Sequence, residues 1–420
     1  MTALGEVERA HREHWGTVLA AVRGRTGSLD LAEDATADAF EAALMAWPRD
    51  GVPSNPAGWL VTTARRKALD RIRGQQRTAR RLALLALRDE VPSDPGPADL
   101  GADWLPDDLL RLVFTCCHPA IAAAAQVPLT LRLVCGLPVR DIARVLLIGE
   151  PTVAARITRA KKKIAAAGIP YRVPLPEQLP DRLDSVLMVV HAAFTAGYDA
   201  PGEGAEQVTS RALHLARELN VLMPHAGEPA GLLALLLLTL ARSASRVDAD
   251  GMAVPLEHQD RSCWDRRAVE QGTQILMTLS KRPAGRFVLQ AAIAAEHARA
   301  EKFEDTDWPR VVRLYDALAL EWPSPVVSLN RAAARIFTTG PAAALAEVEC
   351  LMASDPRLAQ YPYAVASRAD LLRRLGRDAD AVTAYRQALA LAWPRSQEQL
   401  LRHRLHHIED PTRQGQVTHQ

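Results

Sequence analysis

Two clusters of basic side chains are the residues whose type and spacing best fit a chemical role, which is binding a polyanion. Residues 57–88 hold nine basic side chains and one acid, and residues 152–163 hold five and no acid. Because the chain carries a net charge of only +2, this uneven distribution is what favours nucleic acid. The alternative for each cluster is a solvated helix face. The basic residues are Arg65, Arg66, Lys67, Arg71, Arg73, Arg77, Arg80, Arg81 and Arg88, then Arg156, Arg159, Lys161, Lys162 and Lys163.

Three acids form a second candidate surface. Asp34, Asp38 and Glu41 recur at i, i+4 and i+7, so a helix over residues 30–47 places them on one face. This face is either solvated or a docking surface for a basic partner. Asp30 and Glu33 have the spacing of a capping box at the start of that helix.

The first basic cluster belongs to a helix that opens at Asn55-Pro56, with Asn55 as the N-cap. This helix continues through WLVTTARRKALDRIR, residues 59–73. Trp59 is suited to stack on an unpaired base, and a core position explains it equally well. Asp70 is expected to pair with Arg66 or Arg73 on the helix face rather than to act as a catalytic acid.

The second basic cluster ends a helix-turn-helix pattern over residues 139–163. Pro151 marks the start of the second helix, which carries Thr152, Ala155, Arg156 and Arg159 outward and ends in Lys161, Lys162 and Lys163. We expect the first four to face base edges and the lysines to contact phosphates. The apolar positions that join the two helices are Ile142, Leu146, Ile148, Val153 and Ile157.

Other residues could suggest a metal site or an enzyme, but their spacing does not support either. The five cysteines form no CxxC pair, and the neighbours Cys116, Cys117 and His118 cannot easily converge on one metal. The C-terminal half lacks HExxH, GxSxG and Gly-rich phosphate motifs, and DTDW reads as a helix cap at Asp305 or Thr306. We therefore expect no catalytic residue, metal or cofactor. The residues that an acid–base or metal site could use in this half are His191, Asp199, His258, Asp260, Asp305 and Asp307.

The overall pattern predicts an all-α protein of several domains in a reducing cytoplasm, without a signal peptide. Proline-rich breaks fall at 48–56, 91–106 and 169–180, with a softer break at 281–285. The apolar stretch 231–241 is too short to span a bilayer and is expected to be a buried helix. Gly340 and Gly376 lie 36 residues apart in similar segments, close to the tetratricopeptide period.

These segments resemble an extracytoplasmic-function (ECF) sigma factor of the sigma-70 family. The acidic helix, the proline loop and WLVTTARRKALDRIR resemble sigma region 2, and residues 139–163 resemble region 4. Arg66 departs from the asparagine that is usual in the family. Further segments resemble the subgroup with a long C-terminal extension bearing tetratricopeptide-like repeats, although Thr195-Ala196 replaces its usual Asn-Glu. These segments are LRLVFTCCHPA (110–120), HAAFTAGY (191–198), DRSCWD (260–265), LQAAIAAEHA (289–298), DTDW (305–308) and SPVVSLNRA (324–332).

The resemblance implies a non-enzymatic subunit that binds core RNA polymerase, recognises the −10 and −35 promoter elements and melts DNA, with a regulatory extension. Asp34, Asp38 and Glu41 would face the clamp helices of the largest subunit, and the polymerase flap is the second docking point. The loop 48–55 would receive a flipped −10 base, and Arg156 and Arg159 would read the −35 element. The −10 and melting residues implied are Asn55, Trp59, Arg65, Arg66, Lys67, Arg71, Arg73 and Arg77.

The same reading predicts the domain organisation. The boundaries are region 2 at 1–88, a linker at 89–106, region 4 at 107–168, a Pro-rich linker at 169–180, a helical extension at 181–285 and a tetratricopeptide-like domain at 286–420. A second hypothesis is a helix-turn-helix regulator or adaptor with tetratricopeptide repeats that does not bind core polymerase. That hypothesis leaves the acidic helix and WLVTTARRKALDRIR unexplained.

Overall fold

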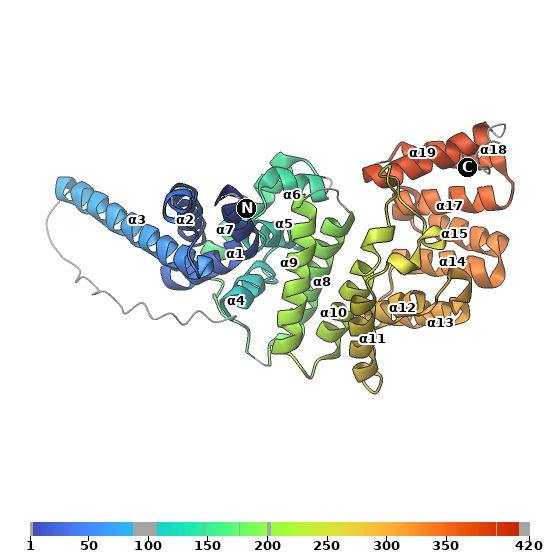
Figure 1. Cartoon of the computed structure of the whole chain (residues 1–420), viewed down its shortest axis with the longest axis horizontal. Helices are drawn as coiled ribbons and strands as arrows, with labels where there is room; N and C mark the ends of the chain where they lie inside the picture. The colour runs from blue at the N-terminus through green and yellow to red at the C-terminus, as the bar shows by residue number, and fades with distance from the viewer. Residues whose placement is uncertain are drawn as a thin grey trace. The chain divides into compact units, whose positions relative to one another are not determined.

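The computed structural model describes residues 3–86, 107–146, 148–175, 177–199, 203–391 and 393–410. Within these ranges the chain forms α-helices and short 3-10 helices without a strand, and one isolated bridge joins Val247 and Ala253. The predicted all-α fold is confirmed. The helices divide into two compact units, Met1–Glu218 and Leu219–Gln420 (Figure 1). The predicted linker 89–106 lies outside the described residues.

Three long helices open the first unit and pack side by side (Figure 1). Alanines along one side of the second helix allow this close packing, and Ala35, Ala39 and Ala43 are fully buried. Trp15 stacks on Phe40 with the ring centroids 5.8 Å apart. The three helices are α1 (Ala3–Thr26), α2 (Leu29–Asp50) and α3 (Pro56–Ala86).

The predicted capping box of Asp30 and Glu33 is wrong. Ser28 is the N-cap of α2, and its hydroxyl accepts a hydrogen bond of 3.3 Å from the Leu31 N–H. Asp30 therefore lies inside the helix, and Glu33 is buried at 8% exposure. A serine caps as well as an aspartate does, so the earlier residue begins the helix.

The loop expected at 48–55 is shorter than predicted, because α2 continues to Asp50 and includes Pro48 in its last turn. The helix ends at Gly51, whose φ of 84° strongly favours glycine and whose N–H donates to Trp47 O. Asn55 then caps α3 as predicted, accepting a hydrogen bond of 2.9 Å from the Gly58 N–H.

Four helices follow and include the predicted helix-turn-helix, formed by α6 and α7. Ile142, Val153 and Ile157 are buried between these helices and their neighbours, and Pro151 lies in the first turn of α7, both as predicted. Leu147, in the turn, lies outside the described residues. The helices are α4 (Asp107–Cys116), α5 (Ala123–Leu133), α6 (Val139–Leu146) and α7 (Glu150–Ala166).

Two further helices, α8 (Leu179–Asp199) and α9 (Glu203–Leu222), are largely included in the first unit. Helix α8 packs against α4, α5 and α6, and Arg182 Nη2 donates to Phe114 O at 2.6 Å. The division between the units therefore falls within α9, rather than at the proline-rich segment 169–180.

The second unit begins with α10 (Gly227–Leu240), which packs against α11 (Arg266–Leu279) and α12 (Arg286–Arg299). Residues 229–238 are all buried, which confirms the prediction of a buried helix. The window Gly227–Ser245 is long and apolar enough to cross a membrane, but 61% of it is buried inside the protein. The short 3-10 helices of this unit are η1 (Ser243–Ser245), η2 (Leu256–His258), η3 (Arg261–Cys263) and η4 (Phe303–Asp305).

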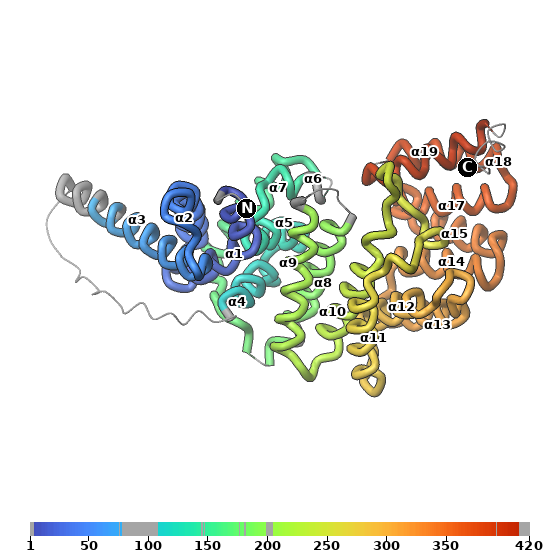
Figure 2. Tube along the Cα trace, viewed as in Figure 1, coloured from blue at the N-terminus to red at the C-terminus, as the bar shows by residue number. Residues whose placement is uncertain are grey.

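Helices α13 to α19 are stacked in chain order at the end of the second unit (Figure 2). Gly340 and Gly376, at φ of 86° and 70°, form the turns of the pairs α14–α15 and α17–α18. The 36-residue offset also relates two buried pairs, Leu345 with Ala381 and Val348 with Ala384, in one core cluster. The helices are α13 (Trp308–Glu321), α14 (Pro325–Thr339), α15 (Pro341–Ser354), α16 (Pro356–Ala359), α17 (Pro362–Arg374), α18 (Asp378–Leu389) and α19 (Arg395–Glu409).

Candidate nucleic-acid interface

The basic residues of α3 divide between its exposed and packed sides. Arg66, Lys67, Arg73 and Arg77 are exposed, as a surface for a polyanion requires. Asp70 lies 4.0 Å from Arg73, which confirms its predicted place on the helix face. These four residues remain the best candidates on α3 for contact with DNA.

Arg65 and Arg71 are the two predicted DNA contacts of α3 that turn toward the protein. Arg65 is partly buried, and burial together with the charge of Arg25 lowers its pKa. Arg71 forms ion pairs with Asp34 at 2.6 Å and Asp38 at 2.8 Å on α2. These acids outweigh the effect of burial and raise the pKa of Arg71.

Trp59 is neither fully exposed nor part of the deep core. Its ring lies edge-on to Trp47, with centroids 5.7 Å apart, so one side of it is packed against α2. The side chain is held in place by this contact and retains partly accessible surface. This position is compatible with both sequence interpretations.

The acidic face of α2 is present, but its three carboxylates differ in environment. Asp34 and Asp38 share Arg71, with their side chains 60% and 25% exposed. Glu41 is exposed and forms no ion pair with any described residue. Sequence reasoning missed Leu44 and Met45 beside it, which are 42% and 75% exposed. The sequence feature that could have identified them is their position one helical turn after Glu41, which places them on the same helix face.

Most predicted contacts of α7 face solvent. Thr152, Ala155, Arg159, Lys162 and Lys163 are all exposed. Arg156 is partly buried, and its Nη1 donates to Ala124 O over a long 3.4 Å. The outer face of α7 is therefore accessible and could enter the major groove of DNA.

Lys161 differs from the phosphate contact that the sequence predicts. Its ammonium donates to Asp30 at 3.1 Å and to the buried carboxylate of Glu33, both on α2. Burial alone would lower the Lys161 pKa, but these two acids raise it. Arg132 of α5 also pairs with Glu33 at 2.6 Å. The sequence analysis did not predict this role of Glu33. The feature that could have indicated it is an acidic residue between Ala32 and Ala35, two positions that are buried in the structure.

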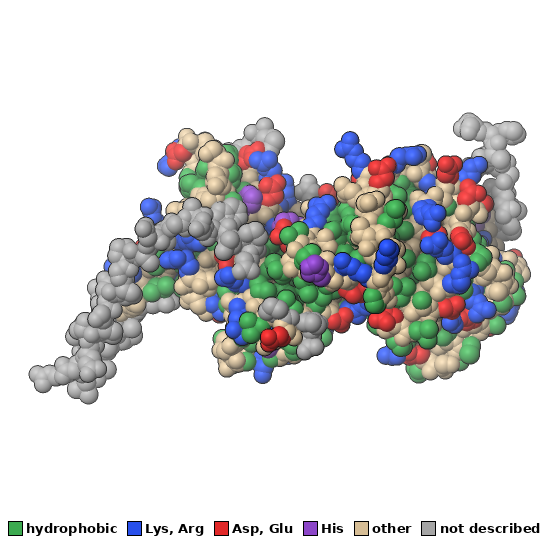
Figure 3. All heavy atoms as spheres, turned by 90° about the horizontal axis from the view of Figure 1, so that it is seen from below, with side chains coloured by type: hydrophobic (Ala, Val, Ile, Leu, Met, Phe, Trp, Pro, Cys, Tyr) green, Lys and Arg blue, Asp and Glu red, His purple; other side chains and the backbone are tan. Residues whose placement is uncertain are grey.

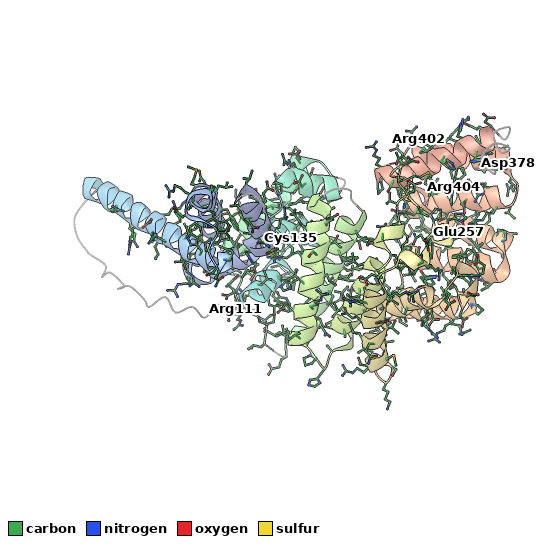
Figure 4. All side chains as sticks on the ribbon, in the orientation of Figure 1. Arg111, Cys135, Glu257, Asp378, Arg402 and Arg404 are labelled. Atoms are coloured by element: carbon green, nitrogen blue, oxygen red, sulfur yellow. The ribbon has the colours of Figure 1, made fainter. Side chains whose placement is uncertain are left out.

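The cysteines behave as packing residues. Cys116, Cys117 and Cys135 are buried and unbridged, and burial raises the pKa of Cys117 to about 12 and that of Cys135 to about 11. Cys135 lies inside the first unit beside α5 (Figure 4). Among the described residues no group of three or more His, Cys, Asp and Glu could hold a metal ion.

The segment DRSCWD, 260–265, has a structural role within the second unit. Asp260 and Asp265 are the N-caps of η3 and α11. Arg261 Nη1 donates to His297 O at 2.6 Å and Ala300 O at 2.7 Å, which caps α12, and its guanidinium lies over Trp264. Capping and packing thus account for these polar side chains.

The caps expected at DTDW are one or two residues out of place. Asp307, rather than Asp305 or Thr306, is the N-cap of α13 and accepts from the Arg310 N–H at 2.9 Å. Asp307 lies directly before the Trp-Pro start of the helix, which is where a cap side chain can reach the third N–H. Thr306 is instead buried at 5% exposure.

The second unit has a hollow, and the basic residues Arg373 and Arg404 in its lining already form ion pairs with Asp370. Glu257 and Arg404, labelled in Figure 4, line a 360 Å³ pocket with His258, His403 and His407. Glu257 is already paired with Arg374 at 2.7 Å. Acidic and basic side chains are interspersed over the face of this unit seen in Figure 3. The nucleic-acid candidates therefore remain those of α3 and α7.

Known families match the same elements. A model described as Sigma-70 region 2 matches residues 11–78, and one described as Sigma-70, region 4 matches residues 112–164. A family of unknown function (DUF6596) matches residues 182–280. An uncharacterized protein of Rhizobium meliloti (strain 1021) is 42% identical over 387 residues, covering 91% of this chain and 90% of that protein. No solved structure matches the chain.

The first match covers most of the bundle of α1, α2 and α3, and the second covers the helix-turn-helix with α5 and the second half of α4. The third lies in the helices that follow. Two independent promoter-binding regions in the expected order confirm the resemblance found in the sequence. The chain belongs to the sigma-70 family, as an ECF-type sigma factor of transcription initiation with a helical C-terminal extension.

Proposed function

We propose that this protein binds core RNA polymerase in the cytoplasm and directs it to promoters as a non-enzymatic subunit. The observation that carries the proposal is the pairing, in one chain, of a region 2 bundle and a region 4 helix-turn-helix. Each has an outward charged face on the helix where the family binds its partner. Together these faces suit a protein that holds polymerase and DNA at once.

Region 2 would dock on polymerase and open the DNA. Glu41 and Asp34 offer exposed carboxylates to the basic clamp helices, and Leu44 and Met45 add apolar area beside them. The second partner of region 2 is promoter DNA, and the exposed arginines of α3 suit the phosphates of its −10 element. Trp59 is held in place by its contact with Trp47 and is only partly buried, so an extruded base can stack on its accessible ring surface.

Region 4 would read the −35 element through α7. Thr152, Ala155, Arg156 and Arg159 lie on the first turns of the helix, the part that enters the major groove in helix-turn-helix proteins. Lys162 and Lys163 follow at its end, where backbone phosphates pass. The flap of the polymerase is the expected second docking point for this region.

The extension would act as a regulatory module. Support comes from α8, which packs against α4, α5 and α6 of region 4, so that the extension contacts a promoter-binding region directly. Helix pairs with a repeated glycine turn, α14–α15 and α17–α18, suit a tetratricopeptide-like partner-binding domain.

Run-off transcription with purified core polymerase tests the proposal. We expect promoter-specific transcripts from the full chain and none from core polymerase alone. A chain ending at Leu222 is the informative truncation, since a cut near residue 170 would also remove α8 and α9 from the first unit. If the chain ending at Leu222 yields a different amount of transcript from the full chain, the result supports a regulatory role for the extension. Equal amounts of transcript would contradict that role.

A pull-down with core polymerase separates this function from that of an adaptor that binds only DNA. Co-purification with core polymerase is expected. Sequence-specific DNA binding without any core polymerase binding would favour the adaptor instead.

A further inference from the structure

Regions 2 and 4 are joined in this structure by a buried ion-pair cluster. Glu33 of α2 has only 11% of its side chain exposed, and it faces Arg132 of α5 at 2.6 Å and Lys161 of α7. Asp30 adds a second contact to Lys161 at 3.1 Å. A carboxylate buried on one region thus has both its cationic partners on the other region. Separating the regions would leave Glu33 without these partners.

Close backbone contacts extend the same interface. A Cβ at Gly16 of α1 would lie 2.2 Å from Val134 O, and one at Gly136 would lie 2.6 Å from the Trp15 ring. Tyr171, after region 4, places its hydroxyl 2.9 Å from Ala20 O of α1. Contacts this close need a fixed fit, because a single methyl group would break them.

Arg211 of α9, in the extension, bonds to both regions at once. Its Nη1 donates to Glu13 O of α1 at 2.8 Å, and its Nε donates to Val134 O, after α5, at 3.4 Å. Arg211 is buried, with an exposed fraction of only 9%. A hollow of 770 Å³ lies beside it, lined by residues of α1 and α9 that include Arg12 and Arg217. The two helices are therefore not closely packed there, and the hydrogen bond from Arg211 to Glu13 O joins them.

The closed arrangement is incompatible with reading a promoter. The −10 and −35 elements are about 25 base pairs apart, or about 85 Å at 3.4 Å per base pair. Regions that touch through Glu33 and Lys161 cannot each occupy one element of a straight duplex. Lys161, near the end of the predicted reading helix, is also already neutralised by acids.

We propose that the polymerase-free chain is held closed, with region 4 docked on region 2 through Glu33 and with Arg211 of the extension stapling the two. The inference rests on the proposed function, because closure matters only if regions 2 and 4 must separate on a promoter. Opening releases Lys161 for phosphate and exposes Glu33. The extension thereby takes part in the step that makes the promoter surfaces available.

The staple is suited to being reversible. Arg211 has no carboxylate within ion-pair distance among the described residues, and burial lowers its pKa. Its Nη2 is buried without a hydrogen-bond partner. In the closed state the charge of Arg211 is removed from water and contacts only carbonyl groups, which costs desolvation free energy. This cost makes the closed state less favourable relative to the open state than it would be with an ion pair. Polymerase and promoter contacts can then overcome the remaining free-energy difference between the two states.

Energy transfer between dyes on the free, full-length chain tests the proposal. Labels go on exposed positions of the two regions, through Arg49→Cys on α2 and Ala166→Cys on α7, with the exposed Cys263 and Cys350 changed to serine. We expect one dominant high-transfer population. Arg211→Met should lower the ratio of closed to open molecules roughly tenfold, as expected for losing hydrogen bonds from a charged group.

Arg217→Met is the matched control, since Arg217 lies on the same helix, is exposed and has no ion pair among the described residues. It should leave the closed population unchanged. Glu33→Gln preserves the side-chain shape but removes the charge, so it should also open the chain, and it decides the matter if Arg211→Met fails to fold. Circular dichroism checks that helix content is retained.

A free wild-type chain already in a broad low-transfer state would overturn the proposal. So would high transfer retained in both Arg211→Met and Glu33→Gln. Opening by Glu33→Gln alone, with folded Arg211→Met still closed, would remove Arg211 as the staple. These energy-transfer measurements are made without polymerase. Their outcome is therefore independent of the transcription assays that test the proposed function.

Discussion

Arg71 of α3 donates two parallel hydrogen bonds to the carboxylate of Asp38 on α2, Nη2 to Oδ1 at 2.9 Å and Nε to Oδ2 at 3.1 Å. The same guanidinium reaches Asp34 at 2.6 Å. A residue predicted for DNA and two predicted for polymerase thus contact each other. Arg71 links the two helices of region 2 and is less available than its neighbours to a phosphate.

Replacing Arg71 by methionine should therefore affect the fold more than DNA binding. We expect the free energy of unfolding to fall by about 0.5–1 kcal/mol, a modest loss because the pair is partly exposed and screened. Arg77→Met, at an exposed position, should leave stability unchanged and reduce the salt dependence of DNA binding instead. Thermal melts and salt titrations measure the two effects. A weaker DNA salt dependence in Arg71→Met with unchanged stability would reverse this assignment.

Glu41 is the cleanest test of docking, because reversing its charge leaves the Arg71 pairs intact. Glu41→Lys would place like charges against the basic clamp helices and should weaken binding to core polymerase at least about tenfold. Glu8→Lys on α1, exposed and also without an ion pair among the described residues, is the matched control. Titration with labelled core polymerase gives both affinities. Equal affinities for the two variants would rule out this face of α2 as the docking surface.

Promoter reading separates base contacts from phosphate contacts on α7. Arg156→Ala should cost about 1–3 kcal/mol on the correct promoter and relax the preference at one or two base pairs of the −35 element. Lys162→Ala should weaken all sequences alike and lower the salt slope by about one. Binding to a set of single-base promoter variants at two salt concentrations measures both. An equal loss on every sequence for Arg156→Ala would contradict its role in base recognition.

His297 makes the second unit sensitive to acid. Burial, and then the charges of Arg242 and Arg261, lower its pKa to about 4. The unfolded histidine titrates near 6.5, so the unfolded chain binds more protons between pH 4 and 6.5. The stability from a neutral His297 is thus fully present above about pH 6.5 and is lost as the pH falls toward 4.

The loss attributable to His297 should be about 2 kcal/mol between pH 7.5 and pH 5. His297→Leu should remove that part of the pH dependence, whereas His225→Leu, at an exposed position, should retain it. Denaturant unfolding at the two pH values supplies the comparison. A wild-type pH dependence that persists in His297→Leu would show that other groups account for it.

The sequence by itself determined the helical class, the helix-turn-helix and the cap at Asn55, because these depend on residues within one or two turns of each other. It also placed the acids of α2 on one face and the exposed lysines of α7 at its end. Gly340 and Gly376 marked equivalent turns for the same reason, since positive φ is a local property that glycine allows.

Only the tertiary structure decided which charges are available. Glu33 and Lys161 are separated by 128 residues, and no local rule connects them. Helical periodicity predicted both helices but not that α7 would lie against α2, which turns a phosphate-binding lysine into the partner of a buried acid. Arg211 and Glu13 are 198 residues apart, and their contact likewise depends on how the helices pack. Charge patterns along a chain identify surfaces, whereas long-range packing determines which of those surfaces remain exposed.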